Sequence, residues 1–211
     1  MFVVASNLSV IYGQGMCVKY DVTQKYKNAY VHYKQGATGC GPLNYVLCLR
    51  AIVRGNSSSN NYAPNIKDKW DNVIDKCGTT AATVPQLIEY FNKNDATWGV
   101  SANKVQSSGR SSAQKTSIAS QMVNLLSQNK RPFVFLGAIS SSSGGYVGHY
   151  YTVWSIAWDG TLENSTVYYT NTADAVKSTF DAQLTSMKLS DFFILADKNT
   201  QSSNYYLLYF Q

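Results

Sequence analysis

The chain carries at residues 35–49 the stretch QGATGCGPLNYVLCL, in which a glycine-flanked cysteine directly precedes an apolar segment. Pro42 suits the first turn of a helix, because its missing N–H is no loss there and its fixed φ fits. The apolar residues behind it keep roughly helical spacing as far as Gly55, which is a natural stop. The stretch therefore predicts a helix that begins next to Cys40.

Cys40 is the first candidate for a functional residue. At the start of a helix it would lie among unpaired backbone N–H groups, at the positive end of the helix dipole. That placement stabilises a thiolate and lowers the thiol pKa, which is what a nucleophilic cysteine needs. We therefore expect Cys40 to be a reactive nucleophile and not a structural thiol.

Composition bounds the class of protein. The chain has 211 residues, enough for one sizeable core, and its 45% apolar and 14% charged content is globular. The net charge of +6 is spread without a Lys/Arg cluster, so we expect no nucleic-acid partner. No apolar run approaches the ~18 residues of a membrane span, so we expect no integral membrane segment.

Four cysteines are too few for a disulfide scaffold in a chain of this length. If Cys40 is a free nucleophile, at most one bridge can form among the other three. Cys48 falls on the same predicted helix and is expected to be a packed core thiol. No CxxC occurs and the two histidines lie far apart, so we expect neither a metal site nor another cofactor.

The polar residues suggest where the protein acts. Tyrosine, serine, threonine and asparagine dominate them, a surface seen more often outside cells than in the cytosol. Residues 1–5 lack a charged leader and are too short for the apolar core of a signal peptide. We expect a secreted or cell-surface protein whose export signal is absent from this sequence.

Periodicity divides the rest of the chain into a helical half and a β half. After the helix at Cys40, further helices are predicted from about residue 66 to 78, over 84–92 behind a capping box at 83–86, and over 118–129, with 99–115 as a loop. Strands are predicted at 132–136, 150–158, 167–170, 192–195 and 205–210, with a flexible segment at 140–145 and a short helix within 179–187.

This order predicts an α+β fold in one domain, 1–211. About 1–130 would form a helical lobe, packed on an antiparallel sheet or barrel lobe at 131–211. The active site would lie between the two.

Two histidines, His32 and His149, are the candidate bases. His149 follows a glycine-rich loop and is predicted to start an apolar strand, which suits a group that must meet a nucleophile from another lobe. A histidine that merely ends a hairpin would give the same pattern. His32 ranks second, because its neighbours indicate an ordinary strand position.

A catalytic imidazole needs an orienting partner on its other nitrogen. The strand predicted at 167–170 ends at Asn171, and Asp174 follows three residues later. If this strand forms a hairpin with the one that starts near His149, Asn171 comes beside the imidazole. We therefore choose Asn171 as the orienting residue and keep Asp174 as the alternative, although each could be a plain turn residue.

Gln35 lies five residues before Cys40 and can point its amide N–H at the space in front of the sulfur. With the backbone N–H of Cys40 it would form an oxyanion hole for a tetrahedral intermediate. The alternative is a solvated loop glutamine.

This ordered set resembles a papain-clan cysteine peptidase, in particular the branch related to bacteriocin double-glycine leader peptidases. The resemblance spans roughly residues 30–175 and rests on Gln35, on the CGP motif at 40–42 and on the segments 148–153 and 167–171. The sequence departs from the pattern twice. Gln35 stands five residues before the cysteine where the clan usually has six, and Asn171 stands where this branch usually has aspartate.

The resemblance implies a papain-like fold and hydrolysis of peptide bonds in a peptide or protein substrate through a thioester on Cys40. His149 would protonate the leaving amine. Without an ATPase or membrane segment beside it, the chain is expected to be a free-standing bacterial peptidase. A propeptide or a protein inhibitor is a further class of partner.

Two other readings compete with the peptidase. A cell-wall amidase of the NlpC type uses the same Cys–His order on a related fold, but it usually shows Asp-Cys-Ser where this chain has glycines on both sides of Cys40. An adhesin or binding module with a vestigial triad is the other alternative, because tyrosines and Ser/Asn loops would suit glycan or protein contact.

Overall fold

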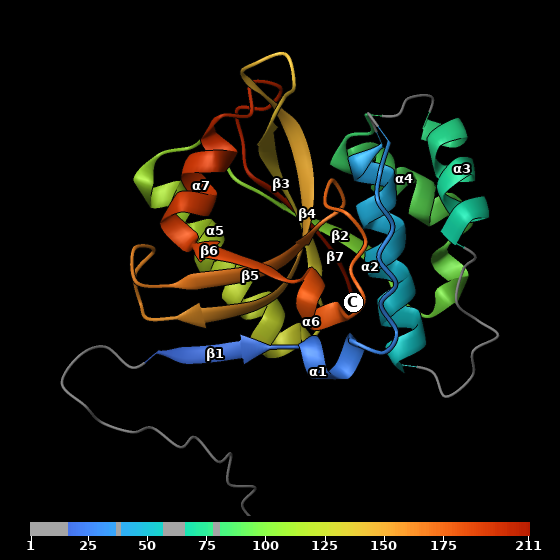
Figure 1. Cartoon of the computed structure of the whole chain (residues 1–211), viewed down its shortest axis with the longest axis horizontal. Helices are drawn as coiled ribbons and strands as arrows, with labels where there is room; N and C mark the ends of the chain where they lie inside the picture. Colours follow the sequence, from blue (N-terminus) through green and yellow to red (C-terminus); the bar gives the residue numbers. More distant parts are fainter. Residues whose placement is uncertain (1–16, 37–38, 57–65, 78–80) are drawn as a thin grey trace, which may run out of the picture.

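A computed structural model describes residues 17–36, 39–56, 66–77 and 81–211. A seven-stranded antiparallel sheet stands between two groups of helices (Figure 1). One side carries α2 (Cys40–Asn56), α3 (Ile66–Cys77) and α4 (Val84–Asn94), and the other carries α5 (Ser112–Asn124) and α7 (Leu189–Asp197). The predicted α+β class with helices packed on an antiparallel sheet is confirmed.

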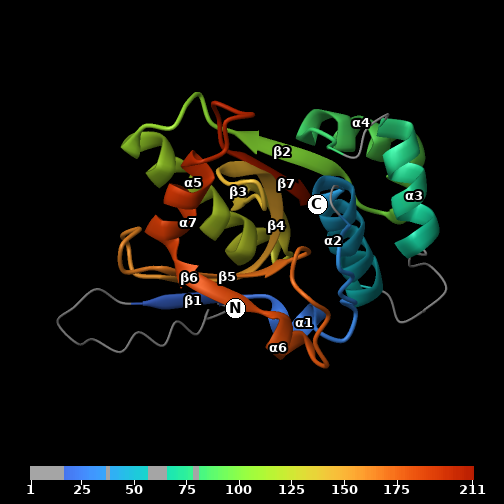
Figure 2. The ribbon, with the colours of Figure 1, turned by 45° about the horizontal axis from the view of Figure 1, so that its top comes forward.

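The sheet has the strand order β2-β7-β3-β4-β5-β6, and β1 pairs with β4. Its strands are β1 (Val18–Asp21), β2 (Ala102–Gln106), β3 (Phe133–Ser140), β4 (Tyr146–Trp158), β5 (Thr166–Asn171), β6 (Thr185–Lys188) and β7 (Tyr206–Phe210). The long β4 is the centre of the sheet, because it pairs with β3, β5 and β1. Figure 2 shows β2 and β7 running together along one edge.

The helical group consists of α2 (Cys40–Asn56), α3 (Ile66–Cys77) and α4 (Val84–Asn94). All three were expected from periodicity. The predicted capping box is present at α4, where Thr83 and Gln86 exchange hydrogen bonds between side chain and backbone. Helix α2 packs against β4 and β3, so its first turn lies beside the strand that carries His149.

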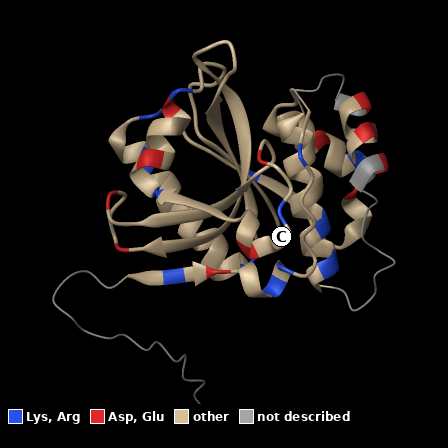
Figure 3. Cartoon of the chain, in the orientation of Figure 1, with Lys and Arg blue, Asp and Glu red and all other residues tan. Residues whose placement is uncertain are grey.

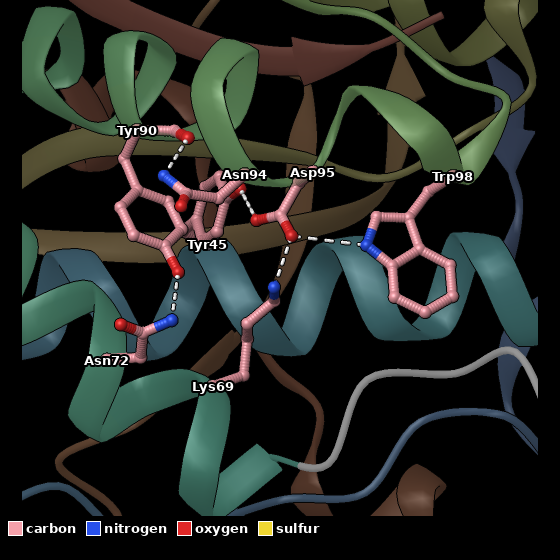
Figure 4. A network of polar contacts seen from close by, with 7 residues as sticks. All are labelled: Tyr45, Lys69, Asn72, Tyr90, Asn94, Asp95 and Trp98. Atoms are coloured by element: carbon pink, nitrogen blue, oxygen red, sulfur yellow. Dashed lines mark hydrogen bonds and ion pairs between the residues drawn. The ribbon is translucent and has the colours of Figure 1, made fainter.

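A buried polar network joins these three helices (Figure 4). Asp95, which is fully buried, follows α4, forms an ion pair with Lys69 on α3 and accepts a hydrogen bond from Tyr45 on α2 over 2.5 Å. Trp98 in the short helix η2 (Ala96–Trp98) donates its indole N–H to the same carboxylate over 3.1 Å. One buried carboxylate therefore fixes the relative positions of α2, α3 and α4.

Two segments have a secondary structure that differs from the one predicted from the sequence. Residues 99–115 are not a loop, because β2 lies within them and α5 (Ser112–Asn124) begins there with Ser111 as its cap. The segment 192–195 is not a strand but part of α7 (Leu189–Asp197). Its buried residues recur at helical spacing, at Leu189, Phe192, Phe193 and Ala196.

Smaller differences concern the remaining elements. The helix expected within 179–187 is only α6 (Phe180–Gln183), and β6 follows it at once. Helix α5 continues into a π-helical turn, η3 (Leu125–Asn129), and a short α1 (Thr23–Tyr26) follows β1. The strands β1 and β2 come from the first 130 residues, so the sheet takes strands from both halves of the chain.

Charged side chains are dispersed over the described part of the chain (Figure 3). Helix α3 carries three exposed acidic residues at helical spacing, Asp68, Asp71 and Asp75. Among the described residues, no helix is both long and apolar enough to cross a membrane.

Candidate active site

Cys40 begins α2, as the sequence predicts, and the glycine before it has a conformational reason. Gly39 has φ of 98°, in the left-handed region that favours glycine, and its carbonyl accepts a helix hydrogen bond from the Leu43 N–H. A side chain at Gly39 would also crowd the Trp70 ring, whose nearest atom would lie 3.1 Å from the Cβ. The turn that presents Cys40 therefore requires glycine.

Gly41 allows α2 to approach the sheet closely. A Cβ at Gly41 would lie 3.0 Å from the Tyr150 ring and 3.1 Å from the Ala82 carbonyl oxygen. Tyr150 follows His149 in β4, and its hydroxyl donates to the same Ala82 carbonyl over 3.0 Å. The missing side chain thus lets the first turn of α2 lie against the strand of the candidate base.

The thiol itself differs from the sequence-based expectation. Burial raises the pKa of Cys40 above its ordinary value, while the backbone N–H groups of Tyr150, Gly41 and Cys40 act in the opposite direction. The helix start therefore stabilises the thiolate as expected, but desolvation outweighs it. Cys40 is therefore a neutral thiol at neutral pH, and it needs a base to become a nucleophile.

His149 is the buried histidine of the cleft. It is the fourth residue of β4 and does not start the strand, because pairing with β3 already begins at Tyr146. Burial lowers the pKa of His149 to about 4, and the hydrogen bond to Asn171 opposes this. The imidazole is therefore neutral at neutral pH and able to accept a proton.

Asn171 holds the other side of the imidazole ring. Its Oδ1 lies 2.8 Å from His149 Nε2 and also accepts the Ala173 N–H over 3.0 Å, while its Nδ2 donates to Asp174 Oδ1 over 3.1 Å. A backbone N–H can only donate and a carboxylate only accepts, so the orientation of the amide is fixed. His149 Nε2 must then carry the proton, which leaves Nδ1 as the free basic nitrogen.

The two reserve candidates lie behind this pair. Asp174 accepts a hydrogen bond from the Asn171 amide, whose other end contacts the imidazole, so it acts on His149 through that amide. His32 accepts a hydrogen bond from the Tyr30 hydroxyl on Nδ1 over 2.8 Å, and its Nε2 lies 3.3 Å from the Asp174 carbonyl. Both ring nitrogens of His32 are thus engaged in bracing the turn that follows β5.

Gln35 is oriented by its neighbour Thr172. The backbone N–H of Gln35 donates to the Thr172 carbonyl over 2.8 Å, and the Thr172 hydroxyl donates to Gln35 Oε1 over 2.5 Å. Because this hydrogen bond occupies the side-chain oxygen of Gln35, the NH2 group of the same amide is left to donate to another partner. Gln35 lines the same cavity as Cys40 and His149, so a donor is available there.

Asn44 is the residue of this region that sequence reasoning missed. It is fully buried on α2, and its Nδ2 lies 2.9 Å from each of the Cys40 and Tyr150 carbonyl oxygens and 3.0 Å from the Thr172 hydroxyl, so its two hydrogens are shared among three acceptors. Its Oδ1 accepts the Thr152 hydroxyl over 2.8 Å. Asn44 thereby ties the start of α2 to β4 and to the end of β5. The signal was a single asparagine among apolar helix residues.

Two cavities meet at Cys40, and both are also lined by Ala81, Gly148 and Gln201. We call the first the apolar pocket; it measures about 250 Å³, and its lining includes Ala82, Val84, Pro85, Leu136, Tyr150 and Tyr206. We call the second the polar pocket; it measures about 470 Å³, and its lining includes Lys34, Gln35, Ser140, Ser141, Ser142 and His149.

The remaining titratable clusters are sparse. Within the described ranges, no three His, Cys, Asp or Glu side chains come together as a metal site. Cys17, Cys40 and Cys48 are free thiols, and Cys48 is fully buried in the core as expected. The side chain of Cys77 lies outside the described part of the chain.

Comparison with known proteins shows the fold and nothing finer. No family model matches the chain, and no curated protein matches it. A solved structure, UfSP from C. elegans, matches with a TM-score of 0.60 at 11% sequence identity. The match covers 94% of this chain but only 35% of UfSP. The chain therefore has a papain-like α+β fold, as the sequence predicted.

Proposed function

We propose that this protein is a cysteine peptidase in which Cys40 is the nucleophile, His149 the general base and acid, Asn171 the orienting residue and Gln35 an oxyanion donor. The papain-like fold makes a protein or peptide the reasonable substrate. As part of the same proposal, the protein is related to the double-glycine leader peptidase branch and acts as a free-standing, secreted bacterial enzyme.

The observation that carries the proposal is the fixed tautomer of His149. Asn171 Oδ1 accepts the proton on Nε2, so Nδ1 is unprotonated, and His149 lines the same cavity as Cys40. At neutral pH both groups are neutral, because burial raises the pKa of Cys40 and lowers that of His149 to about 4, so attack by Cys40 requires its proton to move to Nδ1 as the new bond forms.

Acylation follows from these positions. Cys40 Sγ bonds to the carbonyl carbon of the substrate while its proton moves to His149 Nδ1. The carbonyl oxygen becomes an oxyanion that accepts hydrogen bonds from the Gln35 NH2 group and the Cys40 backbone N–H. The C–N bond then breaks, the imidazolium gives its proton to the leaving amine, and a thioester remains on Cys40.

Deacylation uses the same residues in reverse. The neutral His149 takes a proton from water, and the hydroxyl oxygen bonds to the thioester carbon. The C–S bond breaks, the Cys40 thiolate regains the proton from the imidazolium, and a carboxylic acid leaves. Asn171 keeps the ring oriented in both halves of the reaction.

Cleavage of denatured casein by the full chain, compared with Cys40→Ala and His149→Gln, tests the proposal. Loss of at least about 10³-fold in kcat/KM is expected for either variant, because nucleophile and base act as one unit. An acyl-enzyme on the Cys40 peptide, seen by mass spectrometry after acid quenching, is the second expected result. Cleavage that persists in Cys40→Ala would exclude this mechanism.

The competing functions give different results in the same assay. Release of stem peptides from peptidoglycan without casein cleavage would replace the peptidase by a cell-wall amidase. No turnover of either substrate, together with no reaction of Cys40 with iodoacetamide, would favour a binding module with a vestigial triad.

A further inference from the structure

A separate cavity lies where β1 joins β4, beside α6 (Figure 1). It measures about 320 Å³ and, among the described residues, shares no lining residue with the two pockets at Cys40. His149 lies roughly 20 Å away from it along β4. We call it the β1 cavity; its lining includes Lys19, Asp21, Ser155, Tyr168, Asp181 and Ser186.

The base of the β1 cavity is a row of polar side chains across four strands. Asp21 on β1 lies opposite Ser155 on β4, and Ser155 lies opposite Tyr168 on β5. Tyr168 in turn lies opposite Ser186 on β6. Directly opposite residues of antiparallel strands share one face of the sheet, so these four side chains form one row. The pairing of β4 with β5 also shifts register between Val153 and Ser155, an irregularity that is frequent beside functional sites.

Ser155 is the residue of this row that indicates a ligand. Only 1% of its surface is exposed, and its Oγ has no hydrogen-bond partner among the described residues, which is unfavourable for a buried hydroxyl. The buried Ser165 differs, because its Oγ donates to the Thr161 carbonyl and accepts the Asp159 N–H. The fold therefore leaves the Ser155 hydroxyl unused beside the cavity.

The charged groups of the β1 cavity disfavour an ionic ligand. Lys19 Nζ forms an ion pair with Asp21 over 2.8 Å and lies 5.1 Å from the centre of the Tyr168 ring. Asp181 on α6 takes part in none of the ion pairs between described residues. An anion would therefore meet two carboxylates. A metal ion would lack ligands, since within the described ranges no three His, Cys, Asp or Glu side chains come together.

A neutral molecule with several hydroxyl groups complements this lining, because each hydroxyl both donates and accepts. Such hydroxyls can donate to Asp181 and exchange hydrogen bonds with Ser155, while the Tyr168 ring adds apolar surface for C–H groups. We propose that the β1 cavity binds one pyranose ring of a neutral sugar, free or at the end of a glycan chain. Its volume lies at the lower end of the range of ligand sites, about 300–1,000 Å³, which suits a single ring. The site does not depend on the chemistry proposed for Cys40.

Saturation-transfer difference NMR with the full chain tests this inference. The probes are glucose, galactose, mannose, N-acetylglucosamine and N-acetylgalactosamine, and at least one should receive saturation and give a Kd on titration. Glucuronate, which carries a carboxylate, should bind at least about tenfold more weakly than the best neutral sugar. The methyl glycoside of that sugar separates the two sources, because a site for a chain end accepts it and a site for the free sugar rejects it. Saturation of none of the five sugars overturns the inference.

Ser155→Ala separates a ligand site from a structural role. It removes an unbonded buried hydroxyl, so the melting temperature should be equal or higher, while sugar affinity should fall about tenfold. Ser165→Ala is the matched control, because it removes a bonded buried hydroxyl outside the cavity. Its melting temperature should fall and its sugar affinity should stay within about twofold.

Asp181→Ala should also weaken sugar binding about tenfold, because it removes the carboxylate that accepts from the sugar hydroxyls. Glu163→Ala, at an exposed carboxylate in the turn before β5, is its control and should leave the Kd unchanged. Alkylation of Cys40 with iodoacetamide should also leave the Kd unchanged, which distinguishes this site from a sugar bound in the cleft. Unchanged affinity in Ser155→Ala or in Asp181→Ala would overturn the assignment, whether or not Cys40 is a nucleophile.

Discussion

Asn171 Nδ2 donates to Asp174 Oδ1 over 3.1 Å, on the side of the amide opposite to His149. The sequence offered these two residues as alternative partners of the imidazole. In the structure they form a series, with Asn171 next to the ring and Asp174 behind it. Because the carboxylate only accepts hydrogen bonds, it holds the amide so that the oxygen faces His149.

We predict that Asp174→Asn weakens catalysis by loosening the Asn171 amide. Asparagine can still accept from Asn171 Nδ2 through its own Oδ1, but the bond is no longer charge-assisted; weakening it by about 0.5–1.5 kcal/mol should lower kcat/KM about two- to tenfold, with the change in kcat and not in KM. Asn171→Asp should be worse, because two carboxylates would then face each other. The measurement is steady-state kinetics together with the pH profile of kcat/KM.

The reversed pair provides the control. In the double variant Asn171→Asp/Asp174→Asn, the new amide at 174 can donate to the new carboxylate at 171, which still accepts the His149 proton. The double variant should therefore be more active than Asn171→Asp alone. Strictly additive losses would show that the two residues do not act through each other.

Protonation of His149 should make the fold sensitive to acid. Its pKa of about 4 lies below the ordinary value of 6.5, so the unfolded chain binds a proton first as pH falls. Stability is fully present above about pH 6.5 and declines as pH falls toward 4; about 2 kcal/mol should be lost between about pH 7.5 and pH 5. Urea unfolding at the two pH values measures this.

His149→Gln is the matched variant for this experiment, because it keeps a hydrogen-bonding side chain but does not titrate. It should lose about 2 kcal/mol less than the unaltered chain over the same interval. His32, whose pKa is also lowered by burial, is common to both proteins and cancels in the comparison. Equal losses would mean that His149 is not the buried neutral base described above.

Much of the fold could be predicted from local pattern. The helix behind Cys40 followed from glycine, proline and apolar spacing, and the α4 capping box from Thr83 and Gln86. The hairpin of β4 and β5 brought Asn171 to His149 because antiparallel pairing fixes which ends meet. These features depend on residues that are close together in sequence, or on strands that one short connection joins into a hairpin.

The predictions that failed concern features that depend on tertiary contacts and burial. The FFIL run at 192–195 looks like a strand until Leu189 and Ala196 are included, which complete a helical face. The pKa of Cys40 rises because the fold buries the thiol, and no local pattern contains that burial. Asn44 gains its role only from Thr152, Thr172 and the carbonyls that the fold gathers around it.

Asn44→Ala should both destabilise the protein and slow the reaction of Cys40. The variant leaves buried hydroxyl and carbonyl groups without their partner, at a cost of about 1–3 kcal/mol. The start of α2 also loses its bonds to β4 and β5, so labelling by iodoacetamide should slow. Asn103→Ala, at a more accessible asparagine bonded to Ser101, is the control and should change neither quantity much. Unaltered stability of Asn44→Ala would contradict the bonding described.

Gly41→Ala tests the close approach of α2 to β4. The added methyl group would meet the Tyr150 ring at 3.0 Å and the Ala82 carbonyl at 3.1 Å, so the first helical turn must move. Displacement of the sulfur by a fraction of an ångström should lower kcat/KM by about tenfold or more. Alanine is a better helix former than glycine by about 0.5–1 kcal/mol, which offsets part of the strain. A selective loss of kcat/KM, with little change in urea unfolding, is therefore expected; full activity would show that the contact is unimportant.

The buried Asp95 network should behave as a coupled unit, because one carboxylate serves three elements. Asp95→Ala removes the partner of Lys69, Tyr45 and Trp98 at once and should destabilise the chain by about 3–5 kcal/mol. Lys69→Met leaves the carboxylate buried without its cation and should also be harmful. The double variant Asp95→Asn/Lys69→Met removes both charges, so it should be more stable than the sum of the single changes Asp95→Asn and Lys69→Met predicts.

The exposed pair of Glu89 and Lys93 on α4 is the matched control for this cycle. Water screens that pair, so the same exchange of charges by neutral residues should have a far smaller effect on unfolding. Urea unfolding followed by tryptophan fluorescence measures all variants. If Asp95→Asn and Lys69→Met are strictly additive, the ion pair does not couple α3 to the end of α4.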